Sequence, residues 1–271
     1  MNAHTRHCWS WAVLVTGAVL AYASAGVEAQ PSTPDILPLT QADREAAFPD
    51  FGDMRVSDMM LEDPFNRLVL LDQLEARDAD GRQVLSWDLH AWVGRNLNRL
   101  WIRSEGEKQS GTTDRAELQL LWGHTIARWW DVVAGVRQDF RPGPSQSWGA
   151  FGIQGLAPYR FELEATAFVG EGGQAAARFE AEYELLITNR LILQPLIELN
   201  WYGQDDSPRG IGAGFASAES GLRLRYEFRR EIAPYIGLVR ERKFRGTADL
   251  GRAAGIDTRD TRLVAGIRLW F

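Results

Sequence analysis

The sequence predicts an all-β fold: a 12-stranded antiparallel transmembrane β-barrel that follows a mostly flexible N-terminal segment. Three observations lead to this prediction. From about Phe65 onwards, apolar and polar residues alternate, which is the period of strands with one apolar and one polar face. The last strand, 260–271, ends on the aromatic residue Phe271, a pattern typical of bacterial outer-membrane barrels. Short and long connections also alternate along the chain, so turns and loops would lie at opposite ends of the barrel.

The region before the alternating pattern divides into two parts. The first 29 residues resemble a secretory signal peptide, because Arg6 precedes a short apolar stretch, 11–21, and small residues follow it. That stretch is shorter than the roughly 20 residues that span a bilayer, so a signal peptide is favoured over an anchor. The following part contains five prolines and many acidic residues, which favours a flexible periplasmic segment. The predicted organisation is therefore signal peptide 1–29, periplasmic segment 30–64 and outer-membrane barrel 65–271.

The composition excludes several classes of protein. A net charge of −6 and a pI of about 5.4 argue against nucleic acid as a partner. A mean hydropathy of −0.26 excludes a helical membrane protein but not a barrel, in which half of each strand is polar. Eleven tryptophans suit the aromatic girdles of a barrel. The single cysteine, Cys8, lies in the predicted signal peptide, so the mature protein would have no disulfide or thiolate metal site.

Twelve segments with period-two patterning are expected to form the barrel, and an even number places both chain ends on one side of it. The short connections are GRNL, GHTIAR, APY, TNR and RREIA, whereas the opposite connections include EGEKQSGTTD, RPGPSQS and QDDSPRGIGAGF. The expected strands are approximately 67–77, 83–93, 98–105, 115–122, 129–140, 148–156, 160–169, 175–187, 191–202, 216–228, 235–244 and 260–271.

Charged residues recur on one face of these strands, and they are expected to face the lumen. A charge on the lipid face would cost about 2–4 kcal/mol near the midplane of the bilayer. Two interpretations of the charged lumen stay open: mutual ion pairs that fill it, or an acidic route for cations. The predicted lumen-lining residues are Asp88, Asp131, Arg137, Glu162, Glu164, Glu180, Glu182, Glu198, Glu219, Arg223 and Arg225.

Few residues carry recognisable chemistry. The sequence contains no G-x-S-x-G elbow, P-loop or dinucleotide-binding fingerprint, so we expect neither an enzyme nor an organic cofactor. Met54, Met59 and Met60 are candidate copper ligands, because thioethers are soft donors that select Cu(I). The alternative is that these methionines pack into the barrel mouth. His90, at a lumen-facing position beside Asp88, is the fourth candidate copper ligand.

Long blocks of the barrel region resemble the copper resistance protein B family. They are LVLLDQLEARDADG, RLWIRSEGE, ELQLLWG, WWDVVAGVRQDFRPGPSQSW, GLAPYRFELEATAFVGEGGQAAARFEAEYELLITNRLILQP, GLRLRYEFRREIAPYIG and TRLVAGIRLWF. The resemblance covers about Phe65 to Phe271 and implies an outer-membrane barrel that binds copper and takes part in copper homeostasis. Family members often carry a long N-terminal stretch rich in Met and His. Here only Met54, Met59 and Met60 correspond to it, and no histidine lies between the predicted signal peptide and His90.

Two functions follow from these observations. In the first, the protein lies in the cell outer membrane after signal-peptide cleavage. There it binds Cu(I) or Cu(II), as ligand or cargo, and sequesters copper or passes it across the membrane. Its partners would be outer-membrane lipid and copper ions, with a periplasmic copper protein as a further candidate. In the second, it is a passive or structural pore whose closed, charge-filled lumen has no specific metal site.

Overall fold

The computed structural model describes residues 40–47, 63–79 and 82–271, which belong to two units with a boundary after Met59. The first unit contains helix α1 (Gln41–Ala47), which the sequence did not predict. The Thr40 hydroxyl donates to Asp43 Oδ2 at 2.7 Å, and the Asp43 backbone N–H donates to Thr40 Oγ1 at 3.2 Å. These bonds cap the helix, and the bonds that the Thr40 hydroxyl and backbone N–H donate to the Asp43 carboxylate lower the pKa of that carboxyl group. The predicted signal peptide and the candidate ligands Met54, Met59 and Met60 lie outside the described residues.

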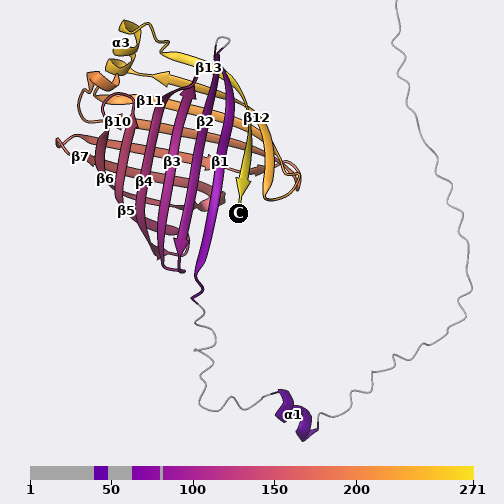
Figure 1. Cartoon of the computed structure of the whole chain (residues 1–271). Coiled ribbons are helices and arrows are strands. Elements are labelled where there is room, and N and C mark those ends of the chain that lie inside the picture. The colour runs from indigo at the N-terminus through magenta and orange to yellow at the C-terminus, as the bar shows by residue number, and fades with distance from the viewer. Residues whose placement is uncertain (1–39, 48–62, 80–81) are drawn as a thin grey trace, which may run out of the picture. The chain divides into compact units, whose positions relative to one another are not determined.

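The second unit is a closed antiparallel β-barrel (Figure 1). Each strand pairs with its neighbours along the chain, and the last strand pairs with the first, with Leu70 opposite Trp270. Strands β8 and β9 are consecutive parts of one strand, because both pair with β10. The 13 labelled strands therefore form the 12-stranded barrel that the sequence predicted. The bounds are β1 (Asn66–Ala79), β2 (Arg82–Gly94), β3 (Asn98–Gln109), β4 (Thr112–Ala127), β5 (Trp130–Arg141), β6 (Gln146–Ala157), β7 (Phe161–Gly170), β8 (Ala175–Tyr183), β9 (Leu185–Leu186), β10 (Leu191–Tyr202), β11 (Gly214–Tyr226), β12 (Ile232–Lys243) and β13 (Arg259–Trp270).

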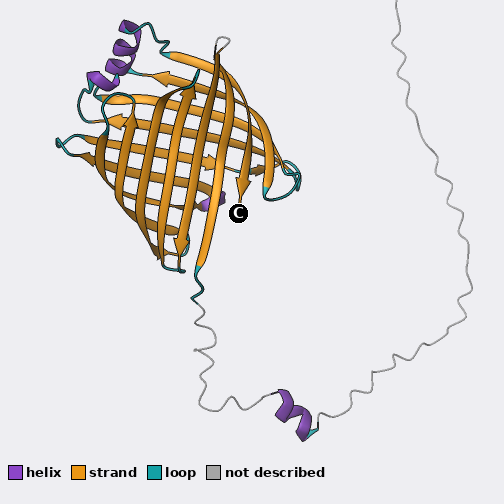
Figure 2. Ribbon diagram, viewed as in Figure 1, coloured by secondary structure: helices purple, strands orange, loops and turns teal. Residues whose placement is uncertain are grey.

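The connections separate into a turn end and a loop end of the barrel (Figure 2). At the turn end, where β1 begins and β13 ends, five connections contain two to five residues each. One of them is the short helix η1 (Pro158–Arg160). At the loop end, residues 203–213 and 244–258 form the two longest connections, which contain η2 (Ser207–Arg209) and α3 (Arg245–Ala253). In the described part of the chain, no helix is long and apolar enough to cross a membrane.

The predicted polar loop EGEKQSGTTD is not a loop in the structure. Strands β3 and β4 continue through it, and only Ser110 and Gly111 form the turn, both with positive φ. Side chains still point alternately inward and outward there. Glu107 faces inward and pairs with Arg262 across the barrel closure, with 3.1 Å between Oε1 and Nη1. The difference in connection length between the two ends therefore comes mainly from the last two loops.

The two faces of the barrel have opposite chemistry. Large apolar side chains cover the outer face, where Leu263 is 70% exposed and Ile236 is 64% exposed. The interior instead buries charged side chains, and both Arg223 and Arg225 are 1% exposed. A smaller apolar cluster of Leu121, Val133, Trp148, Ala150, Phe168 and Ala176 fills one side of the interior. Such an inverted distribution suits a barrel with lipid outside and ion pairs within.

Candidate functional site

A cavity of about 700 Å³ occupies the interior of the barrel. Its lining begins at loop-end residues such as Gln109 and Asp257 and extends inward to His90 and Glu164. Twelve Asp or Glu side chains line it, against six Arg or Lys side chains. An excess of carboxylates in a recess with low-dielectric walls concentrates cations. The cavity is therefore the strongest candidate site among the described residues.

One wall of this cavity carries six carboxylates in direct cross-strand register, which we call the acidic row. Each member lies opposite the next on the neighbouring strand, from Glu164 on β7 to Asp260 on β13. Glu164 is the fourth residue of β7 from the turn end, and Asp260 is the second residue of β13 from the loop end. The row thus extends along the wall from deep in the lumen to the cavity mouth at the loop end. Every member lines the cavity. Its members are Glu164, Glu180, Glu198, Glu219, Glu241 and Asp260.

The acidic row is only partly neutralised. Arg103 binds Glu164 and Arg262 binds Asp260. Arg178 and Arg77 approach Glu198 and Glu219 less closely, each with a nitrogen-to-oxygen distance of 3.8 Å. No hydrogen bond or ion pair joins Glu180 or Glu241 to any residue that the structure describes. Like charges directly opposite on neighbouring strands are destabilising, so the middle of this row is held at a cost to stability.

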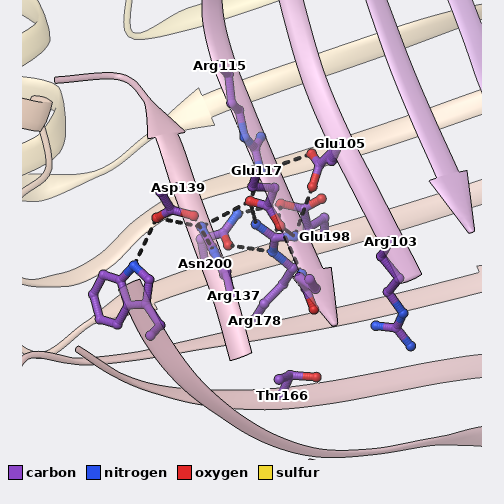
Figure 3. A network of polar contacts seen from close by, with 12 residues as sticks. Arg103, Glu105, Arg115, Glu117, Arg137, Asp139, Thr166, Arg178, Glu198 and Asn200 are labelled. Carbon is purple, nitrogen blue, oxygen red and sulfur yellow. Dashed lines mark hydrogen bonds and ion pairs between the residues drawn. The ribbon is translucent and has the colours of Figure 1, made fainter. Parts of the chain in front are cut away.

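The facing wall carries a second set of four carboxylates in register, Asp88, Glu105, Glu117 and Asp139, on β2 to β5. We call it the arginine-paired row, because guanidinium groups bind three of its members (Figure 3). Glu117 Oε2 accepts from Arg178 Nη2 at 2.8 Å and lies 3.0 Å from Arg137 Nη2. Arg115 Nη2 lies 2.9 Å from Glu105 Oε1.

Asp139 is the last member of the arginine-paired row. It does not line the cavity but is buried among neighbouring side chains. Its carboxylate accepts from Arg137 Nε at 2.6 Å, Trp148 Nε1 at 2.9 Å and Arg209 Nη1 at 3.3 Å. Arg209 comes from the loop 203–213, which therefore reaches across the barrel mouth to β5. Gly212 in this loop donates to Thr247 of α3 at 2.9 Å, so the two long connections are bound to each other.

Arginines also cross the lumen and narrow it. Arg178 on β8 binds Glu105 on β3 at 2.9 Å as well as Glu117 on β4. Deeper in the barrel, Arg103 on β3 donates to both Glu164 on β7 and Gln154 on β6. The cavity lining stops near this contact, which forms its floor.

Between the floor and the turn end, a further group of ion pairs fills the interior. Arg268 lies 2.7 Å from both Asp72 and Glu184, and Arg225 lies 2.6 Å from Glu184. None of these four residues lines the cavity.

His90 lies at the inner part of the cavity, as a partner of one carboxylate. Its Nε2 atom is 3.0 Å from Asp88 Oδ1. Within residues 40–47, 63–79 and 82–271, no group of three or more His, Cys, Asp or Glu side chains is arranged to hold a metal ion. For a metal ion, His90 therefore offers one nitrogen donor with one carboxylate, that of Asp88, beside it.

The eleven residues that the sequence predicted to line the lumen lie in three environments. Five of the eleven line the cavity: Asp88, Glu164, Glu180, Glu198 and Glu219. Five more are buried in contacts inside the barrel: Asp131, Arg137, Glu182, Arg223 and Arg225. Glu162 lies near the start of β7 and is exposed.

Sequence reasoning missed several residues of the site. Glu105 was both the last residue of a predicted strand and the first of a predicted loop, and Glu117 lay inside the predicted strand 115–122; both keep the alternation of their strands. Glu241 and Asp260 lay inside predicted strands, and their alternation with Val239 and Arg262 on the inner face was the available signal. The cross-strand register, which decides which carboxylates lie opposite one another, could not be predicted from the sequence of each strand taken separately.

Comparison with known proteins identifies the family. The family model described as "Copper resistance protein B precursor (CopB)" matches residues 65–271. A copper resistance protein B from Escherichia coli is 50% identical over 236 residues, which cover 87% of this chain and 78% of the relative. A copper resistance protein B homolog from Pseudomonas syringae pv. tomato is 49% identical over 249 residues, covering 92% and 83%. The chain belongs to the copper resistance protein B family. This membership confirms the resemblance seen in the sequence.

Among solved structures, the NanC porin is similar to this copper resistance protein B family member in fold. The TM-score is 0.51 at 13% sequence identity, and the match covers 74% of this chain and 98% of the porin. At this identity the likeness concerns the barrel alone. The family and the fold together support an outer-membrane β-barrel associated with copper resistance.

Proposed function

We propose that the protein lies in the outer membrane, binds copper ions as cargo in its lumen, and contributes to copper resistance by holding copper there or passing it across. The single observation that carries this proposal is the acidic row, which lines the cavity from its mouth to its floor. Membership of the copper resistance protein B family supports copper as the cation in this proposal. Neither a catalytic step nor an organic cofactor is part of the proposal.

The chemistry of the cavity favours Cu(II) over Cu(I) in the lumen. Carboxylate oxygens and an imidazole nitrogen are donors that suit Cu(II), whereas Cu(I) prefers sulfur. Glu180 and Glu241, which have no partner among the described residues, would bind first, because no guanidinium described there has to be displaced from them. Gln119 adds a further oxygen donor, since its buried Oε1 atom accepts no hydrogen bond in the described structure and the residue lines the cavity.

His90 and the methionines have distinct roles in this proposal. His90 and Asp88 receive the ion at the inner part of the cavity, where a nitrogen donor adds affinity for Cu(II). Met54, Met59 and Met60 act as soft ligands for Cu(I) in the N-terminal segment. A periplasmic copper protein is the further partner that would exchange copper with that segment.

The ion pairs at the floor and below it favour a second function, a barrel with a closed lumen. Arg103, Arg225 and Arg268 bind carboxylates from several strands in the half of the barrel nearer the turn end. A structural or passive barrel would need these contacts and would have no use for unpaired carboxylates. Copper binding therefore discriminates between the two functions.

The decisive experiment is a Cu(II) titration of the full-length protein in detergent, followed by calorimetry and electron paramagnetic resonance. The double variant Glu180→Gln/Glu241→Gln should bind Cu(II) at least about tenfold more weakly, a loss of about 1.4 kcal/mol or more. Glu171→Gln/Glu231→Gln is the matched control, because it removes two exposed carboxylates outside the cavity. Equal affinities in the wild type and both variants would exclude the acidic row as the copper site.

The methionines are tested separately with Cu(I) under reducing conditions. Met54→Leu/Met59→Leu/Met60→Leu should lose Cu(I) binding while Cu(II) binding to the lumen stays unchanged. A His90→Gln variant should instead bind Cu(II) more weakly and bind Cu(I) as the wild type does. If the methionine variant retains full Cu(I) affinity, these three residues are not ligands.

A further inference from the structure

Three arginines form an exposed basic cluster on the outer wall of the barrel at the loop end. Arg240 and Arg242 lie on β12, and Arg259 begins β13. Val239 is buried and Glu241 lines the cavity, so the arginines that alternate with them face outward. Arg242 lies directly opposite Arg259 in the cross-strand register.

These arginines have no acidic partner in the described structure. Neither a hydrogen bond nor an ion pair joins any of the three side chains to a carboxylate, although 13 other Arg residues of the described chain do form ion pairs. The Arg242 guanidinium instead lies over the Phe244 ring, 4.8 Å from its centroid. Direct opposition of Arg242 and Arg259 is unfavourable unless an anion from outside the chain lies between them.

The surface next to the cluster is apolar. On the same face of β12 and β13, Leu238 and Leu263 are exposed and follow the arginines towards the middle of the barrel. Outward charges are tolerated only near the edge of the hydrocarbon layer, where the cost of exposure to lipid becomes small. The basic cluster therefore marks the level at which acyl chains meet lipid head groups.

We propose that Arg240, Arg242 and Arg259 bind the phosphate groups of a lipid in the leaflet that surrounds the loop end. Guanidinium groups match phosphate oxygens in bidentate geometry, and each is permanently charged. Three of them on two neighbouring strands suit a head group with more than one phosphate, with its acyl chains along Leu238 and Leu263. This inference rests on the proposed outer-membrane location, but it does not depend on copper binding.

Native mass spectrometry of the full-length protein in detergent tests the proposal, with lipid A carrying two phosphates or none as the probe. Arg240→Gln/Arg242→Gln/Arg259→Gln should lower retention of the bisphosphorylated lipid by about 100-fold, since each basic residue contributes about fivefold near a membrane surface. Dephosphorylated lipid A should bind weakly to every variant. The conservative variant Arg240→Lys/Arg242→Lys/Arg259→Lys should retain most of the binding.

Arg128→Gln/Arg190→Gln/Arg230→Gln is the matched control, because it removes the same charge from exposed arginines at the turn end. It should retain the bisphosphorylated lipid at the wild-type level. Equal loss in both glutamine variants, or equal binding of the dephosphorylated lipid, would overturn the proposal. If the first variant does not fold, the single variant Arg259→Gln gives the same test with a fivefold effect. Cu(II) affinity measured on the same samples separates this result from failure of the copper proposal.

Discussion

The acidic row and the arginine-paired row use the same residue types on facing walls of one lumen, but their chemistry differs. In the arginine-paired row, Glu117 has close contacts with Arg137 and Arg178, and Asp139 accepts three hydrogen-bonding groups. In the acidic row, Glu180 and Glu241 have no partner in the described structure. A carboxylate with several guanidinium partners stabilises the barrel, whereas one without a partner is available to a cation. The difference predicts which carboxylates have a structural role and which are available to a cation.

The largest effect is expected from a substitution in the arginine-paired row. Glu117→Gln leaves Arg137 and Arg178 close together without the carboxylate that neutralises them. Removing one partner of a buried ion pair costs about 3–5 kcal/mol, so we expect unfolding at markedly lower denaturant concentration. Tryptophan fluorescence in urea measures this loss, with Glu171→Gln as the control. If Glu117→Gln is as stable as the wild type, the arginine-paired row does not stabilise the barrel more than the acidic row does.

An intermediate effect is expected at the floor of the cavity. Arg103→Gln releases Glu164 from its guanidinium partner and makes the cavity more negative by one charge. Local cation concentration should rise, and we expect Cu(II) affinity to increase on the order of tenfold. Conductance in planar bilayers shows in addition whether this contact closes the lumen. Arg128→Gln, which removes an exposed charge at the turn end, should change neither quantity.

The smallest effect is expected for stability in the acidic row. Glu180 lies directly opposite both Glu164 and Glu198, so Glu180→Gln removes two like-charge contacts. Relief of such contacts contributes roughly 0.2–1 kcal/mol each, so the variant should be as stable as the wild type or slightly more stable. Urea unfolding without copper is the measurement. Strong destabilisation would indicate that Glu180 has a structural role like that of Glu117.

Much of the fold could be predicted because a strand places alternate side chains on opposite faces. The inward positions of Arg223 and Arg225 and the outward position of Leu263 all follow from the period of two. The prediction failed between Glu105 and Arg115, because polar residues occupy both faces of the strands there and the alternation of side-chain direction leaves no alternation of hydrophobicity. Helix α3 and the contact of Arg209 with Asp139 were not predicted, because both depend on long-range contacts.

The sequence by itself determined that the protein is a barrel with an apolar exterior and a charged interior, since that pattern is local and repeats on every strand. Only the tertiary structure decided which carboxylates are neutralised. Arg178 meets Glu117 61 residues away, and Arg103 meets Glu164 at the same separation, because closure brings opposite strands face to face. Cross-strand register also aligns Glu180, Glu198 and Glu219. Each contact depends on how the strands are staggered around the cylinder, and no single segment of the chain contains that information.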